Sequence, residues 1–173
     1  MLINRALPRY DEREYHQIEI SGERTEVYET VRALDFSDSV LIRTLFRLRG
    51  LPPTATNVDG LLQVGFLLVD ETTNVEFVLG LVGKFWALRA HILQLDAVQY
   101  SEFSQRGYAK LAWNFAIRKS APGVVRLSTE TRIVCTDSHS KSRFKLYWFL
   151  IGRFSGLTRK EMLRVVKRKI EAK

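Results

Sequence analysis

The chain has 173 residues and a mass of 20.0 kDa, the size of one domain that closes a core without disulfides or metals. Its 46% hydrophobic and 27% charged residues are typical of a globular protein and exclude a disordered one. Cys135 is the one cysteine, so an internal disulfide and a multi-cysteine zinc site are both excluded. We expect a single domain over residues 1–173, in which residues 1–13 form a flexible or extended N-terminal segment.

The first half of the chain predicts one strand followed by two short helices. Residues 14–20 alternate His16, Ile18 and Ile20 against polar neighbours, which indicates a strand that ends at Ser21-Gly22. Residues 23–34 and then 38–49 carry apolar side chains at intervals of three or four, which is typical of helices. Gly50 and the two prolines after Leu51 end the second of these helices.

The middle of the chain changes to the period of two that is typical of strands. The apolar runs 61–70 and 74–86 are joined by residues 71–74, which predict a hairpin turn. Residues 91–103 form a weaker strand-like stretch. Residues 108–119 and 124–136 then alternate clearly on either side of the turn at 121–123. These patterns predict antiparallel strands with one buried face.

The alternation assigns side chains to the two faces of these last strands. Trp113, Phe115, Thr129 and Thr131 fall on the face that also carries Leu127 and Ile133, so we expect them to point into the core. Glu130 and Arg132 fall on the opposite face. We expect them to form an exposed charge ladder, with a catalytic or headgroup-binding pair as the alternative.

Asp137 or Ser138 can cap one long final helix that runs from about residue 139 to the end. Its predicted core stripe, interrupted by Ser155 and Thr158, consists of Phe144, Tyr147, Trp148, Ile151, Phe154, Met162, Val165 and Val166. A second apolar set lies on the far side of the helix and consists of Leu146, Phe149, Leu150 and Leu157. A helix packed on one sheet does not need this second set, so something must cover it.

The order of one strand, two short helices, several antiparallel strands and one long helix resembles the helix-grip fold of the START-like (SRPBCC) superfamily, which includes polyketide cyclases and lipid-transfer domains. The runs TETRIVCTD (129–137) and SRFKLYWFLIGRFSGLTRKEML (142–163) look like an uncharacterised bacterial branch of that superfamily. The resemblance implies an α+β fold in which a curved antiparallel sheet wraps around the C-terminal helix. It also implies a cavity between sheet and helix for an apolar ligand, and it brings no catalytic motif.

The residues themselves place hydroxyl groups on the apolar faces that should line such a cavity. The candidate lining residues are Trp113, Phe115, Thr129, Thr131, Trp148, Ser155 and Thr158. The alternative is that each threonine merely suits a strand and each helical hydroxyl bonds its own backbone. On the cavity interpretation, Thr131→Val changes stability little and weakens binding of a ligand that uses the hydroxyl.

We therefore expect a protein that binds, transports or senses a small hydrophobic ligand such as a lipid or polyketide-like molecule. A cyclase- or dehydratase-like enzyme that uses the same cavity is the alternative, and an interaction protein without a pocket is a third class. We expect no catalytic residue, no metal and no cofactor, because His16, His91 and His139 have no partners at ligand spacing. Cys135 falls on the buried side of its strand and is expected to act as a small hydrophobe.

The net charge of +8 belongs to the last helix. Residues 139–173 carry 11 Lys and Arg against 2 Glu, or 11 − 2 = +9, and residues 1–138 carry 16 − 17 = −1. Nucleic acid is not expected as a partner, because the aromatic residues of this helix lie on its core stripe. The second apolar set instead suits a homodimer, an anionic membrane or cover by residues 51–62. Basic groups that encircle the helix favour the dimer or the intrachain cover.

The compartment follows from the start of the chain and from its most apolar stretch. The first residues are charged and lack the apolar region of a secretory signal. Residues 75–88 are interrupted by Glu76 and Lys84 and are shorter than the roughly 20 residues that span a bilayer. We therefore expect a soluble cytoplasmic protein.

Overall fold

The computed structural model describes residues 1–33, 35, 39, 57–87 and 91–172. In chain order they form α1 (Ile3–Ala6), β1 (Glu12–Ser21), α2 (Arg24–Ala33), α4 (Val58–Gln63), β2 (Leu67–Thr72), β3 (Glu76–Gly83), α5 (Ala97–Glu102), β4 (Ala109–Ala121), β5 (Val124–Cys135) and α6 (Ser138–Glu171). The described strands form one antiparallel sheet in the order β1-β5-β4-β3-β2.

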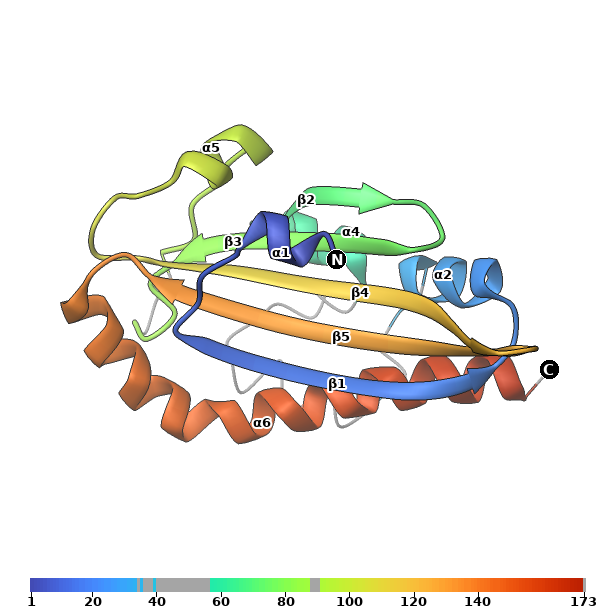
Figure 1. Cartoon of the computed structure of the whole chain (residues 1–173). Helices are drawn as coiled ribbons and strands as arrows, with labels where there is room; N and C mark the ends of the chain where they lie inside the picture. Colours follow the sequence, from blue (N-terminus) through green and yellow to red (C-terminus); the bar gives the residue numbers. More distant parts are fainter. Residues whose placement is uncertain (34, 36–38, 40–56, 88–90, 173) are drawn as a thin grey trace.

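The long helix α6 lies along the β1 and β5 side of this curved sheet, as Figure 1 shows. The element order and the topology are those of the predicted α+β helix-grip fold. Asp137 begins the helix as its N-cap, because its carboxylate accepts the Ser140 amide at 2.9 Å. The first of the two helices expected after β1 is α2, and the second, over 38–49, lies outside the described residues.

The clearest alternating patterns gave the strands correctly. β1, β4 and β5 lie where the sequence predicts them, and the turns between strands have the expected chemistry. Asn74 has a φ of 61° in the β2–β3 hairpin, and Gly123 has a φ of 69° between β4 and β5. Both values lie in the left-handed region that asparagine and glycine tolerate best.

Two of the weaker strand predictions were wrong. The run 61–70 begins inside the helix α4, whose N-cap Asn57 accepts the Gly60 amide at 2.7 Å, and β2 starts only at Leu67. The stretch 91–103 contributes one isolated bridge, Leu93 to Val82, and then forms α5. Asp96 and Gln99 form a capping box at its start, a helix signal that a short apolar run obscured.

The main core lies between the inner face of the sheet and the helices α2, α4 and α6. Its buried members include Ile20, Val27, Leu61, Phe77, Leu127, Phe144, Met162 and Val166. In the middle of α6, Ser155 and Thr158 are buried on the core stripe as predicted, but Phe154 is exposed and Arg159 is buried, contrary to the prediction. The helix therefore turns polar side chains toward the sheet at this point.

The N-terminal segment over residues 1–13 was expected to be flexible or extended, but part of it is helical. It forms α1 on the outer face of the sheet, where Ile3 and Leu7 are buried against Val78 and Ala112 (Figure 1). The Leu2 and Ile3 amides donate to the Glu76 carboxylate at 2.8 and 3.2 Å. The physical reason is that Val78 and Ala112 place apolar side chains on the outer face of β3 and β4, which need cover.

Glu130 and Arg132 lie on the predicted outer face, but they are buried rather than exposed. Arg132 Nε donates to Glu130 Oε1 at 2.7 Å, and Arg132 Nη1 donates to the Leu7 carbonyl at 3.0 Å, so the N-terminal segment covers the pair. Burial raises the pKa of Glu130, but hydrogen bonds from Arg13 and Arg132 outweigh it and lower that pKa overall. The pair therefore holds the N-terminal segment on the sheet.

Three features of the described residues bear on function. No helix among them is long and apolar enough to cross a membrane. No group of three or more His, Cys, Asp or Glu side chains in this part of the chain is placed to hold a metal ion. Burial raises the pKa of Cys135 to about 12, so at neutral pH the side chain is the thiol and not the nucleophilic thiolate.

Candidate ligand site

Strand pairing brings four of the predicted lining residues together on the inner face of the sheet. In the β4–β5 register Trp113 lies opposite Thr131 and Phe115 lies opposite Thr129. The rings of Trp113 and Phe115 are 5.1 Å apart, and all four side chains are buried. The alternation of these two strands therefore placed these residues correctly.

The edge strand β1 adds a titratable side chain beside each of these two cross-strand pairs. Glu14 pairs with Thr131, and His16 pairs with Thr129. The sequence predicts His16 on this strand without a site role and does not single out Glu14 as a site residue. The signal that could have identified both is the alternation of β1, because Glu14 and His16 share the face of the buried Ile20.

The helix α6 closes the cluster from the other side with a buried arginine. The Arg159 side chain is only 6% exposed, and its Nε donates to Thr131 Oγ1 at 2.8 Å. Its guanidinium carbon lies 4.1 Å from the centre of the Trp113 ring, which is a cation–π contact. The sequence alone does not single out Arg159, because it is one of many basic residues in this helix; its position four residues after Ser155, on the same stripe, is the signal that could have identified it.

Glu14 lies directly against the backbone of α6 at Gly156. A Cβ atom at position 156 would collide with Glu14 Oε1, so the missing side chain gives the carboxylate its space. His16 Nε2 lies 3.1 Å from the same oxygen, within hydrogen-bond distance. The other oxygen, Oε2, is buried and has no hydrogen-bond partner in the described part of the chain.

The hydroxyl groups are not equivalent. Thr129 accepts from Trp113 Nε1 at 2.7 Å and donates to the Asn114 carbonyl at 2.8 Å, and Thr158 donates to the Phe154 carbonyl at 2.9 Å. These two hydroxyls are therefore engaged within the chain, and the bond of Thr158 to its own helix backbone is the one that the alternative interpretation expected. Ser155 is buried, whereas Trp148 is half-buried and stacks on Phe144 at 5.5 Å.

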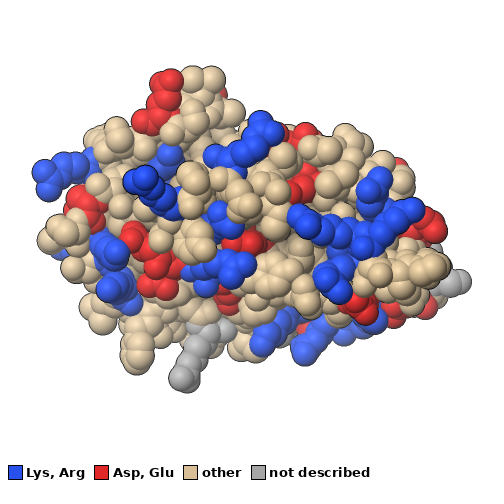
Figure 2. All heavy atoms as spheres, in the orientation of Figure 1, with Lys and Arg blue, Asp and Glu red and all other residues tan. Residues whose placement is uncertain are grey.

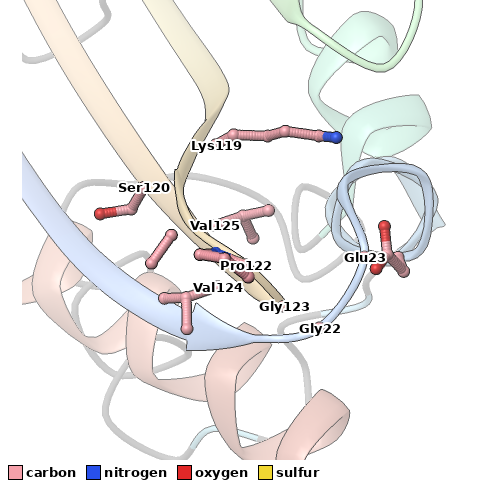
Figure 3. Close-up of a pocket in the computed structure, with 9 residues that line it drawn as sticks. Gly22, Glu23, Lys119, Ser120, Pro122, Gly123, Val124 and Val125 are labelled. Atoms are coloured by element: carbon pink, nitrogen blue, oxygen red, sulfur yellow. The ribbon is translucent and has the colours of Figure 1, made fainter.

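The structure has a pocket that lies outside the predicted site between the sheet and α6. It has a volume of about 320 Å³ and lies at the β4–β5 turn, beside the residues that follow β1 (Figure 3). Glu23 and Lys119 are its charged lining residues, and none of the seven predicted lining residues touches it. The cavity between the sheet and α6 therefore remains a prediction.

Comparison with known proteins adds little to this geometry. No family model and no curated protein matches the chain. Similar solved structures include the hypothetical protein jhp0584 from Helicobacter pylori, with 8% identity over 92% of this chain and 89% of that one and a TM-score of 0.43. The Zhui aromatase/cyclase from Streptomyces sp. R1128 has 11% identity over 92% and 95% of the two chains and a TM-score of 0.34. Ara h 8.0201 has 9% identity over 88% and 98% and a TM-score of 0.28. Likenesses of this strength support no inference about activity, so the site is interpreted from its own chemistry.

Proposed function

We propose that this protein binds a small, largely apolar molecule that carries a hydroxyl group, in a cavity between the inner face of the sheet and α6. The observation that supports the proposal is the buried Glu14 Oε2 atom, which accepts no hydrogen bond from the described residues. An unsatisfied buried acceptor costs free energy, and a hydroxyl of a ligand removes that cost.

The surroundings of Glu14 fit the rest of such a ligand. The proposed cavity is lined by Trp113, Phe115, Thr129, Thr131, Trp148, Ser155 and Thr158, together with Glu14, His16 and Arg159. Its aromatic residues offer flat apolar contact area, and its few polar groups fix the orientation of the ligand. This combination favours a phenol, a sterol or a polyketide-like molecule over a plain hydrocarbon.

A matched pair of probes tests the proposal. We expect 2-naphthol to bind more tightly than naphthalene, as measured by the quenching of tryptophan fluorescence. The variant Glu14→Gln should lower the affinity for 2-naphthol by about tenfold, the effect of losing a charged acceptor, and should leave naphthalene binding unchanged. Glu19→Gln is the control, because Glu19 lies on the same strand with its side chain on the exposed face.

Two results would contradict the proposal. One is that neither probe binds and native mass spectrometry of the purified protein shows no small-molecule adduct. The other is that both probes bind equally and Glu14→Gln affects neither, because the carboxylate would then contribute nothing to recognition.

A catalytic role, such as that of a cyclase, is the second candidate, and one contact favours it. Glu14 and His16 are 3.1 Å apart and lie on the same sheet face as Thr131, which binds Arg159. An acid–base pair near a cation can remove a proton next to a carbonyl group and stabilise the resulting enolate. Deuterium exchange at the central carbon of 2,4-pentanedione, accelerated by the protein and lost in His16→Gln, would support this role over binding alone.

A further inference from the structure

The face of α6 that points away from the sheet carries large apolar side chains in contact with solvent. Leu146, Phe149, Leu150 and Leu157 are 69%, 80%, 60% and 49% exposed. At about 100° per residue they occupy the half of the helix opposite the buried Phe144, Ser155 and Met162, over a length of about 16 Å. We call these four residues the outer apolar face.

Basic side chains surround the outer apolar face. Arg143 and Lys145 lie at its N-terminal end, and Lys160 and Arg164 lie at its C-terminal end, all of them exposed. Over Ser138–Glu171 the sequence has 10 Lys and Arg against 2 Glu, or 10 − 2 = +8. An apolar strip bordered by cations on a single helix is the pattern of helices that lie on anionic lipid.

The acids of α6 are already engaged within the chain. Glu161 accepts from Arg168 at 2.8 Å and lies 3.8 Å from Arg164. Glu171 accepts from the Ser21 amide at 2.9 Å and lies 3.2 Å from Lys167. A second copy of this chain would therefore bring cations against cations across the outer apolar face, without carboxylates on the helix to pair with them.

We propose that the outer apolar face docks α6 on an anionic lipid surface. Phe149 and the leucines enter the boundary between headgroups and acyl chains, while Arg143, Lys145, Lys160 and Arg164 bind the lipid phosphates. Charge complementarity selects this occupant over a homodimer, and the described residues, 57–62 among them, leave the four side chains exposed. The proposal does not depend on the ligand site, because it uses the opposite side of the helix.

Vesicle sedimentation with the full chain tests the proposal. The protein should bind phosphatidylcholine vesicles that contain about 30% phosphatidylglycerol, should not bind pure phosphatidylcholine, and should be released as salt rises from about 0.1 to 1 M. Phe149→Glu should lower the partition coefficient on the order of tenfold or more. Val98→Glu is the matched control, because Val98 is 64% exposed on α5, away from α6, and this variant should bind as wild type does.

The electrostatic part has its own pair of variants. Lys145→Gln combined with Lys160→Gln should weaken binding by about fivefold for each lysine removed. Arg118→Gln combined with Lys119→Gln, at the exposed end of β4, removes the same charge elsewhere and should have a smaller effect. Thermal unfolding verifies that each variant is folded.

Three outcomes would overturn the proposal. The first is that the wild type does not bind anionic vesicles. The second is that Phe149→Glu and Val98→Glu bind equally well, which would leave only general attraction by net charge. The third is that light scattering finds a dimer that Phe149→Glu dissociates, because the face would then be a contact between copies.

Discussion

Replacing Thr131 with valine separates a structural role of this hydroxyl from a role in ligand binding. From the sequence alone we expected the substitution to change stability little. The structure changes that expectation, because Thr131 Oγ1 accepts the Nε hydrogen of Arg159 at 2.8 Å. Valine keeps the shape of threonine and suits a strand, so the main change is the loss of this acceptor.

The size of the effect follows from the burial of both partners. Thr131 is 2% exposed and Arg159 is 6% exposed, so water does not easily replace the lost acceptor. A hydrogen bond to a charged group contributes about 1.5–3 kcal/mol, and a buried charged donor left without its acceptor costs a similar amount. We therefore expect Thr131→Val to lower the free energy of unfolding by about 1.5–3 kcal/mol.

Urea denaturation followed by tryptophan fluorescence measures this change. Thr72→Val is the control, because Thr72 is exposed in β2, and its effect should remain within about 0.5 kcal/mol. Arg159→Met, alone and combined with Thr131→Val, completes a double-mutant cycle whose coupling energy should exceed about 1 kcal/mol. A Thr131→Val effect no larger than that of the control, or a coupling energy near zero, would refute the assignment of this bond.

Two further predictions concern the carboxylates. Gly156→Ala should lower stability relative to Gly152→Ala, because both gain about 1 kcal/mol of helix propensity, but the new Cβ collides with the Glu14 carboxylate in the first and only presses on the edge of the Trp148 ring in the second; equal stabilities of the two variants would contradict this. The stability contributed by Glu130 should be fully present above its unfolded pKa, near the ordinary value of 4.5, and should be lost as the pH falls through its depressed folded value. Unfolding free energies measured between about pH 3 and pH 7 should therefore fall less steeply in Glu130→Gln than in the wild type, and an unchanged slope would contradict the role of the pair with Arg132.

The sequence predicted those parts of the fold that local patterns encode. The alternation over β4 and β5 placed Trp113, Phe115, Thr129 and Thr131 on one face, and the structure brings these four together. The second apolar set of α6 was also found correctly, because helical periodicity over many residues is a strong signal. The predicted cavity itself depends on packing between distant elements, which no local pattern encodes.

The main errors have a shared cause, which is contact between segments far apart in the chain. The alternation of β5 predicts a solvent-exposed outer face. In the structure residues 1–7 cover this face, and the pair of Glu130 and Arg132 is therefore buried. The sequence of α6 alone predicts that Arg159 is a surface cation. Its hydrogen-bond acceptor, Thr131, lies 28 positions earlier in the chain, so the local pattern does not reveal it. A charge is assigned to the surface by default because burying it alone is expensive, so the partner must be known first.

The middle of α6 departs from the usual burial pattern on both of its sides: polar side chains are buried on one side, and large apolar side chains are exposed on the other. Between residues 146 and 159 the helix turns Ser155 and Arg159 toward the sheet and leaves Phe149 and Leu157 in solvent. Each exposed large apolar side chain forgoes up to about 1.5–3 kcal/mol of burial, and the buried guanidinium is stabilised by its contacts with Thr131 and Trp113, among others. Departures of this kind concentrate at binding sites, because a bound ligand or surface supplies the apolar contacts and hydrogen bonds that the isolated chain lacks. A hydroxyl-bearing ligand against Glu14 on one side and an anionic lipid surface on the other would each satisfy one of these two faces.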